Sequence, residues 1–177
     1  MPPCGKGLRI VATVGHLAAG VAISSASGYL RDKLVLATLT ASALAPDVDF
    51  LLGLPHRTLT HSIGFATAVG VVVGITMWRM DRPRPPFVGI LAGLAVASHL
   101  VLDILTAPAP IPAMWPLSGV EFKLAEPLIP AAPPFSELLS PRGVRGAILE
   151  IGWSSAVIAA AIWLDAWWHE RRRSSAR

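Results

Sequence analysis

The chain has 177 residues, of which 53% are hydrophobic and 15% are charged, with a mean hydropathy of +0.58. This composition excludes an ordinary soluble domain, and the single cysteine, Cys4, excludes an intrachain disulfide and a cysteine-rich zinc site. The net charge of +4 does not indicate nucleic-acid binding, because the basic residues lie at the ends of apolar stretches. We therefore predict an all-α integral membrane protein, a single polytopic domain over residues 1–177 that contacts membrane lipids and no nucleic acid.

Five apolar stretches predict about four or five transmembrane helices. The first resembles a signal peptide in composition, but its length suits a span and it carries His16, so we interpret it as a mature helix. The second is shorter than the roughly 20 residues that a span requires. It either runs on towards Phe50 or crosses the bilayer only partly. The predicted helices cover about 8–30, 34–50, 62–78, 87–106 and 144–168.

The connections between these helices carry their own signals. Thr60 or Ser62 can cap the third helix, with Thr60 otherwise free to orient His61. Residues 107–142 are rich in proline and cannot form a regular helix or a central strand. Apolar side chains within this segment predict an ordered cap at the membrane interface, with disorder as the alternative. The last helix ends in tryptophans and the run Arg171–Arg173, which is typical of an interfacial anchor.

Residues 46–62 predict a metal-binding loop between two apolar helices. Two prolines and Gly53 prevent one continuous helix. Asp47 and Asp49 are two residues apart, so an extended backbone would point both to the same side. Carboxylate and imidazole groups are ligands of divalent metals, and the stretch gathers four of them: Asp47, Asp49, His56 and His61.

Further ionisable residues are predicted to reach the same membrane face. His99 and Asp103 are four apart, so they share one face of the fourth helix near its end. His16 lies about two turns into the first helix from that face, and Glu150 one or two turns into the last. Ionisable groups in a span are costly unless they are paired or ligated. The alternatives are that His16 is a packed polar residue and that His99 and Asp103 form a hydrogen-bonded pair without metal.

The positive-inside rule gives the sidedness of this face. If the run Arg171–Arg173 is cytoplasmic, the loop 46–62 and the segment 107–142 lie outside, so the site is on the outer face. Lys6 and Arg9 oppose this orientation, because five spans would place them outside as well. The sidedness of the N-terminus therefore stays open.

The ordered motifs resemble the inner-membrane, metal-dependent hydrolase family described as LexA-binding. The resemblance implies a multi-pass protein of the bacterial or archaeal cytoplasmic membrane that performs metal-dependent hydrolysis. A glycine commonly follows the Asp-x-x-Thr segment in that family, whereas this chain continues with Ala107-Pro108, so the turn beside the site differs. The motifs that carry the resemblance are His16, Pro46-Asp47-x-Asp49, His56-Arg57-x-x-Thr60-His61-Ser62, Ser98-His99-x-x-x-Asp103-x-x-Thr106 and Trp115-Pro116-x-Ser118.

These residues predict a membrane-bound hydrolase in which metal-activated water attacks a phosphoester or other ester that is lipid-borne or interfacial. We expect one or two divalent ions, zinc first, with manganese or iron as alternatives. Asp47 is a ligand or general base, and Arg57 can pair with a substrate phosphate. The expected metal ligands are His16, Asp49, His56, His61, His99 and Asp103.

Two other functions fit the same residues. A divalent metal-ion transporter is one, because His-x-x-x-Asp on a spanning helix is also typical of a cation pathway. Clustering at one face instead of at the middle of the membrane counts against it. The other is a non-catalytic membrane protein in which a structural metal ties the loop to the fourth helix. The sequence indicates neither the substrate nor an oligomeric state.

Overall fold

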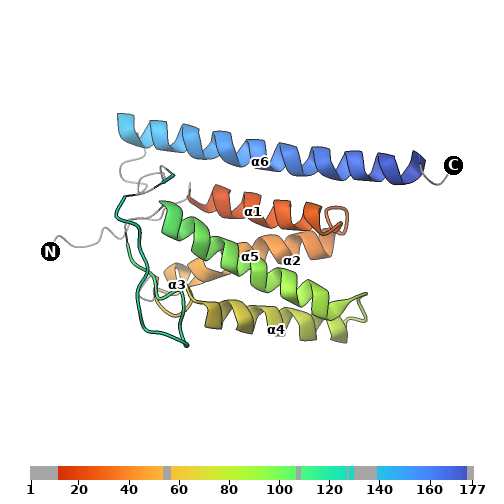
Figure 1. Cartoon of the computed structure of the whole chain (residues 1–177), viewed down its shortest axis with the longest axis horizontal. Coiled ribbons are helices and arrows are strands. Elements are labelled where there is room, and N and C mark those ends of the chain that lie inside the picture. The colour runs from red at the N-terminus through yellow and green to blue at the C-terminus, as the bar shows by residue number, and fades with distance from the viewer. Residues whose placement is uncertain (1–11, 54–56, 107–108, 127, 130–138, 175–177) are drawn as a thin grey trace.

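The computed structural model describes residues 12–53, 57–106, 109–126, 128–129 and 139–174. Within these ranges the chain is helical, and the only β-type pairing is an isolated bridge between Ile111 and Phe122. This confirms the predicted all-α class. The elements in chain order are α1 (Ala12–Ala26), α2 (Lys33–Leu44), the 3-10 helix η1 (Ala45–Asp47), α3 (Val48–Leu51), α4 (Ile63–Arg79), α5 (Pro85–Thr106) and α6 (Pro141–Ser174) (Figure 1).

Helix α5 is the centre of the bundle. It contacts α1, α2 and α4, and buried residues recur along its whole length, from Val88 to Asp103. The largest apolar cluster joins α5 to α2 and α4 through side chains such as Leu39, Met77 and Leu91. Helix α6 packs against α1 on the outside of this core (Figure 1). The end of α5 and the starts of α4 and α6 lie at the same end of the bundle.

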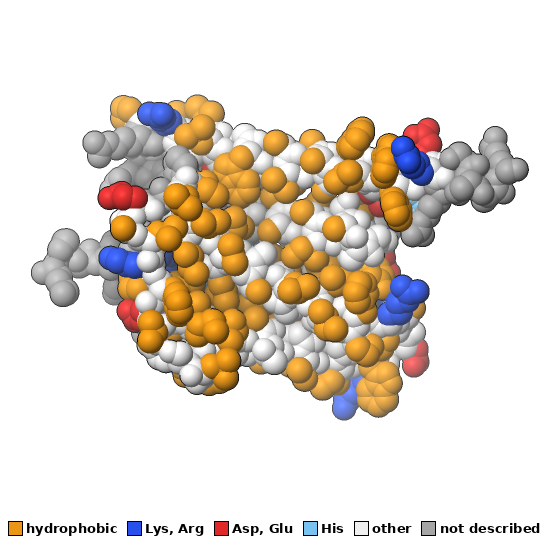
Figure 2. Space-filling model, viewed as in Figure 1, with side chains coloured by type: hydrophobic (Ala, Val, Ile, Leu, Met, Phe, Trp, Pro, Cys, Tyr) orange, Lys and Arg blue, Asp and Glu red, His pale blue; other side chains and the backbone are white. Residues whose placement is uncertain are grey.

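Two of the described helices, Pro85–Thr106 and Gly143–Arg171, are long and apolar enough to cross a membrane. Val14–Ala26 and Ile63–Arg79 are apolar but shorter. The predicted number of four or five spans therefore stays a prediction. On the face drawn in Figure 2, hydrophobic side chains cover the middle, while charged side chains lie towards the two ends. This distribution agrees with an apolar belt between two polar interfaces.

The second predicted helix differs from the structure. Helix α2 ends at Leu44, and the chain continues to Leu51 as the 3-10 turn η1, which contains Pro46, and the short helix α3, so the one regular helix that would run on towards Phe50 is interrupted. The 12 residues of α2 rise about 18 Å, less than a hydrocarbon core of roughly 30 Å. The backbone at Asp47 and Asp49 is helical, so the condition under which both carboxylates would point to the same side is not met. Asp47 ends η1 and Asp49 lies in α3, so the two carboxylates point in different directions.

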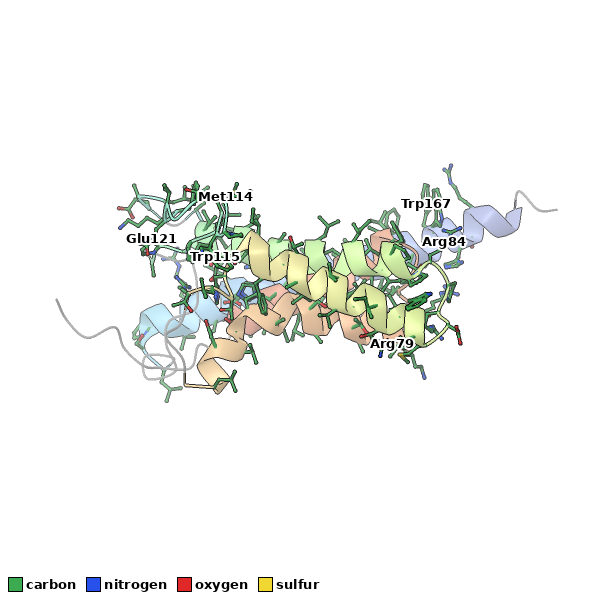
Figure 3. The ribbon with its side chains drawn as sticks, turned by 90° about the horizontal axis from the view of Figure 1, so that it is seen from below. Arg79, Arg84, Met114, Trp115, Glu121 and Trp167 are labelled. Carbon is green, nitrogen blue, oxygen red and sulfur yellow. The ribbon has the colours of Figure 1, made fainter. Side chains whose placement is uncertain are left out.

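The described part of the proline-rich segment forms an ordered cap over the start of α4. The backbone N–H of Ile63 donates to Ala113 O at 2.8 Å, and that of Gly64 donates to Trp115 O at 2.9 Å. Ile111 and Ala113 are buried against the end of α5. Figure 3 shows Met114, Trp115 and Glu121 at this end of the molecule and Arg79, Arg84 and Trp167 at the opposite end. The predicted position of the cap at a membrane interface stays a prediction.

Ser62 is the N-cap of α4, as the sequence predicts. Its Oγ accepts a hydrogen bond from the Phe65 N–H at 3.2 Å and donates to Leu59 O at 2.6 Å. We expect Ser62→Ala to lower the free energy of unfolding by about 1 kcal/mol, because a helix N–H loses its acceptor. Chemical or thermal unfolding in detergent measures this change. Unchanged stability would show that the cap contributes nothing.

Candidate metal centre

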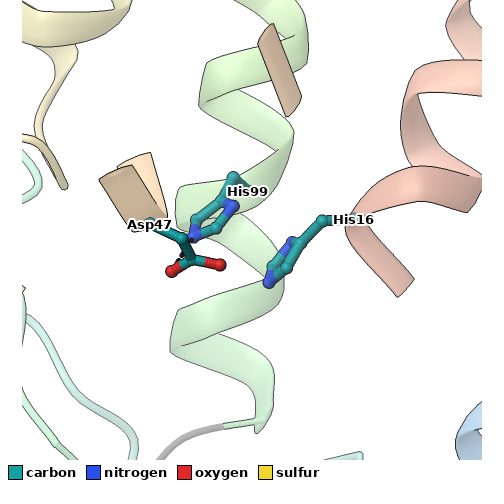
Figure 4. Close-up of side chains that lie close together, drawn as sticks. All are labelled: His16, Asp47 and His99. Atoms are coloured by element: carbon teal, nitrogen blue, oxygen red, sulfur yellow. Dashed lines mark ion pairs between the residues drawn. The ribbon is translucent and has the colours of Figure 1, made fainter. Parts of the chain in front are cut away.

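Four separate elements bring histidine and carboxylate side chains together at one end of the bundle. His99 and Asp103 come from the last turns of α5, Asp47 from η1, His61 from the residue before the α4 cap, and His16 from α1. His61 and His99 are fully buried, and Asp103 is nearly so. Figure 4 shows the rings of His16 and His99 beside the Asp47 carboxylate. The predicted convergence of these five residues is thus present in the structure.

Four side-chain atoms form the compact centre of this group, which we call the four-atom group: Asp47 Oδ1, His61 Nε2, His99 Nε2 and Asp103 Oδ2. Asp103 Oδ2 lies 3.4 Å from His61 Nε2 and 3.9 Å from His99 Nε2. Asp47 Oδ1 lies 3.8 Å from His61 Nε2 and 3.5 Å from His99 Nε2. Each carboxylate oxygen therefore faces both imidazole nitrogens.

Three atoms of the four-atom group, those of His61, His99 and Asp103, fit a divalent metal, because they all lie within 4.8 Å of one another. Ligand atoms placed about 2.0–2.1 Å from a tetrahedral ion are separated by roughly 3.4 Å, which is close to the distances observed. His99 Nε2 and Asp103 Oδ2 are buried and have no hydrogen-bond partner among the described residues. Such atoms are costly in an apolar interior unless something binds them. The mixed nitrogen and oxygen donors suit zinc, manganese or iron.

His99 is held with one nitrogen towards this group by a backbone carbonyl. Its Nδ1 lies 2.8 Å from Ala43 O, at the end of α2. A carbonyl oxygen can only accept, so Nδ1 carries the proton and Nε2 presents its lone pair to the carboxylates. Metal-binding histidines commonly have such a partner on the second nitrogen. Sequence reasoning missed this contact because any residue type offers the same carbonyl.

Asp49 lies behind His61 and outside the four-atom group. Its Oδ2 is 3.5 Å from His61 Nδ1 and accepts hydrogen bonds from Thr60 Oγ1 at 2.8 Å and Arg57 N at 3.1 Å. The helical backbone of α3 directs the fully buried carboxylate to this side of the ring. Asp49 belongs to neither group of potential ligands found among the described residues, and its predicted role as a metal ligand stays a prediction.

His16 borders the group on the α1 side. Its ring stacks on His99 with centroids 3.6 Å apart, and its Nε2 lies 4.0 Å from Asp103 Oδ1. The buried Nδ1 has no hydrogen-bond partner among the residues that the structure describes. His16, Asp47 and His99 form a second group of potential ligands that shares His99 with the group His61, His99 and Asp103. The geometry is thus compatible with the predicted one or two ions.

Arg57 places a cation beside the carboxylates. Its backbone has a φ of 65°, a left-handed turn that is uncommon for a residue other than glycine. Its Nη2 lies 3.4 Å from Asp103 Oδ1, and its Nη1 donates to Ala109 O at 3.4 Å. If the histidines are neutral, Asp47, Asp49 and Asp103 contribute three negative charges and the Arg57 guanidinium one positive charge. The net charge of these groups is then −2. A divalent cation would balance it.

Of two further predicted positions, one is outside the described residues and the other lies elsewhere in the bundle. His56, a predicted ligand, lies outside the described residues. Glu150 is buried where α6 packs on α1, with its Oε1 3.7 Å from the place that a Cβ on Gly15 would occupy. It belongs to neither group of potential ligands found among the described residues.

Comparison with known proteins gives one match. The family model described as "YdjM inner membrane protein" matches residues 11–170, which is most of the chain. This confirms the predicted association with the inner membrane. The description names neither an activity nor LexA binding, so both of these parts of the predicted resemblance stay predictions. No curated protein and no solved structure matches the chain.

Proposed function

We propose that this chain, which belongs to the YdjM inner membrane protein family, is a membrane-bound, metal-dependent hydrolase. The observation that supports the proposal most strongly is the four-atom group, which is built from segments that lie far apart in the sequence. Ionisable groups inside a membrane protein are costly unless they are paired or ligated, and a divalent cation would ligate carboxylates and imidazoles together. We expect one or two divalent ions, zinc being the first candidate.

In this proposal His61, His99 and Asp103 hold the metal. Three protein ligands with a free fourth position are typical of catalytic zinc sites. A bound metal would supply a Lewis acid that activates water and polarises a phosphoryl oxygen. Asp47 faces both histidines and has 35% of its side chain exposed, unlike the buried ligands. Because water can reach this carboxylate, we assign it as a general base or a further ligand.

Arg57 supports a phosphoester as the substrate. Its guanidinium lies beside Asp103 at the edge of the site, with 11% of the side chain exposed. A planar guanidinium can bind two phosphate oxygens at once. Exposed apolar side chains occur close by in sequence, Leu52 after α3 and Leu59 after Arg57. A lipid-borne or interfacial phosphoester could bind the guanidinium through its phosphate and contact the apolar side chains through its acyl chains.

An assay of purified protein in detergent with phosphomonoester and phosphodiester substrates tests the proposal. We expect turnover that a chelator abolishes and added metal restores. Arg57→Ala should lower kcat/KM by about 100-fold, because one charged donor to the phosphate is lost. Arg57→Lys should recover part of this activity, since the charge returns without the bidentate geometry. Absence of turnover in metal-loaded protein, or full activity of Arg57→Ala, would overturn the assignment.

A divalent metal-ion transporter is the alternative. His99 and Asp103 lie on α5, one of the described helices long enough to cross a membrane, which favours this reading. The two residues lie at the end of that helix, whereas transporter sites typically lie near the middle of the membrane. Metal flux in proteoliposomes without phosphoester turnover would support transport.

A further inference from the structure

We propose that Thr60 and Asp49 are positioning residues that hold the His61 ring with Nδ1 protonated and Nε2 directed into the four-atom group. The part of this inference that concerns metal affinity rests on the proposed metal-dependent function. The part that concerns the ring of His61 rests only on the contacts of the three side chains.

The direction of the hydrogen bonds follows from which of the three groups, Thr60, Asp49 and His61, can donate a proton. Thr60 Oγ1 lies 2.8 Å from Asp49 Oδ2 and 3.1 Å from His61 Nδ1. An ionised carboxylate only accepts, so the single hydroxyl proton of Thr60 goes to Asp49. The Thr60 oxygen is then left as an acceptor towards the ring. The proton between Thr60 and His61 must therefore come from Nδ1.

The consequence is a fixed tautomer of His61. A neutral imidazole carries one N–H, so a proton on Nδ1 leaves Nε2 with a lone pair. This nitrogen lies 3.4 Å from Asp103 Oδ2, where a metal ligand is required. His99 also has its proton on Nδ1, because this nitrogen donates to Ala43 O. Two unrelated acceptors thus orient two histidines identically, which argues that their Nε2 atoms share one ligand.

Burial makes this arrangement rigid. Asp49 and His61 are both fully buried, so water does not compete for their contacts. Asp49 Oδ2 also accepts the backbone N–H of Arg57 at 3.1 Å. One carboxylate therefore fixes both the ring of His61 and the left-handed turn that presents Arg57. We infer that Asp49 sets the relative position of the metal site and the phosphate-binding guanidinium.

Metal affinity of substituted proteins gives the first test. Thr60→Val keeps the shape of the side chain but removes the hydroxyl, and we expect zinc affinity to fall by about 10–100-fold. Thr60→Ser restores the hydroxyl and should restore the affinity. Ser62→Ala is the matched control. It removes the hydroxyl of the residue that follows His61 in the sequence, and this hydroxyl contacts Leu59 and Phe65. It should lower stability and leave zinc affinity unchanged.

The cobalt-substituted proteins report on the ligand geometry directly. We expect the visible absorption spectrum of Thr60→Val to differ from the native spectrum and that of Thr60→Ser to match it. A merely structural role for Thr60 would lower the thermal midpoint and leave the zinc affinity and the cobalt spectrum of the folded fraction unchanged. That result would overturn the inference.

Nitrogen chemical shifts of histidine in the metal-free native protein give a second test that needs no substitution. We expect Nδ1 of His61 to carry a proton that it donates to Thr60 Oγ1, and an Nδ1 without a proton would overturn the inference. The two proposals fail differently. A proton on Nδ1 of His61 in a protein that binds no metal refutes the hydrolase and supports the positioning of His61. Tight zinc binding that Thr60→Val leaves unchanged supports the metal site and refutes the positioning of His61 by Thr60.

Discussion

Purified in detergent, the native chain is expected to carry a divalent metal that His61→Ala and His99→Ala each lose. Each substitution removes one imidazole from the four-atom group, leaving the carboxylates of Asp47 and Asp103 beside an incomplete site. Since loss of an orienting partner alone lowers affinity about 10–100-fold, loss of a ligand should leave less than about a tenth of the native metal content. Elemental analysis of monodisperse protein measures this content.

His169→Ala is the matched control for these substitutions. His169 lies on α6 at the opposite end of the bundle, and its Nε2 is 3.5 Å from Asp165 Oδ1. Removing this imidazole should leave the metal content at the native level. A folded native protein that contains no metal, or one that keeps its metal in both site variants, would refute the proposed centre.

His16→Ala separates a centre of one ion from a centre of two. His16 belongs only to the second group of potential ligands, with Asp47 and His99. If a single ion is held by His61, His99 and Asp103, the variant should keep close to its full metal content. If two ions bind, the content should fall by about half, because the second ion loses a ligand of its own.

Gly89→Ala is expected to destabilise the protein, because α4 and α5 pack with almost no space between their backbones. A Cβ at Gly89 would lie 2.6 Å from Gly70 O and 3.0 Å from Gly74 Cα. Backbone atoms cannot rotate away as a side chain can, so the helices would have to separate. We expect a loss of about 1–3 kcal/mol in the free energy of unfolding, measured by thermal or chemical unfolding in detergent.

Gly152→Ala is the control for this prediction. Gly152 lies within α6, and a Cβ there would meet nothing within 4 Å. The substitution should be neutral or stabilising by up to about 1 kcal/mol, because alanine is the better helix former. Equal effects of the two substitutions would show that the Gly70–Gly89 contact does not limit the packing of α4 on α5.

The sequence was sufficient to predict the helical class and the convergence of His16, Asp47, His61, His99 and Asp103. Long apolar stretches with few charges allow no other membrane-compatible structure than helices of this length. The spacing of four between His99 and Asp103 puts both on one face of any helix, whatever the tertiary packing. The cap at Ser62 also follows from local chemistry. Local spacing and composition decide these features, so they could be read without a structure.

The features that only the tertiary structure decided depend on contacts between distant segments. The orientation of His99 comes from the carbonyl of Ala43 across two helices, which carries no sequence signal. Asp49 lies behind His61 because η1 and α3 are helical, whereas an extended chain would point Asp49 to the same side as Asp47. The close approach of Gly89 to Gly70 likewise depends on which faces of α4 and α5 meet. Each of these is a matter of relative placement, which residue spacing within one segment does not specify.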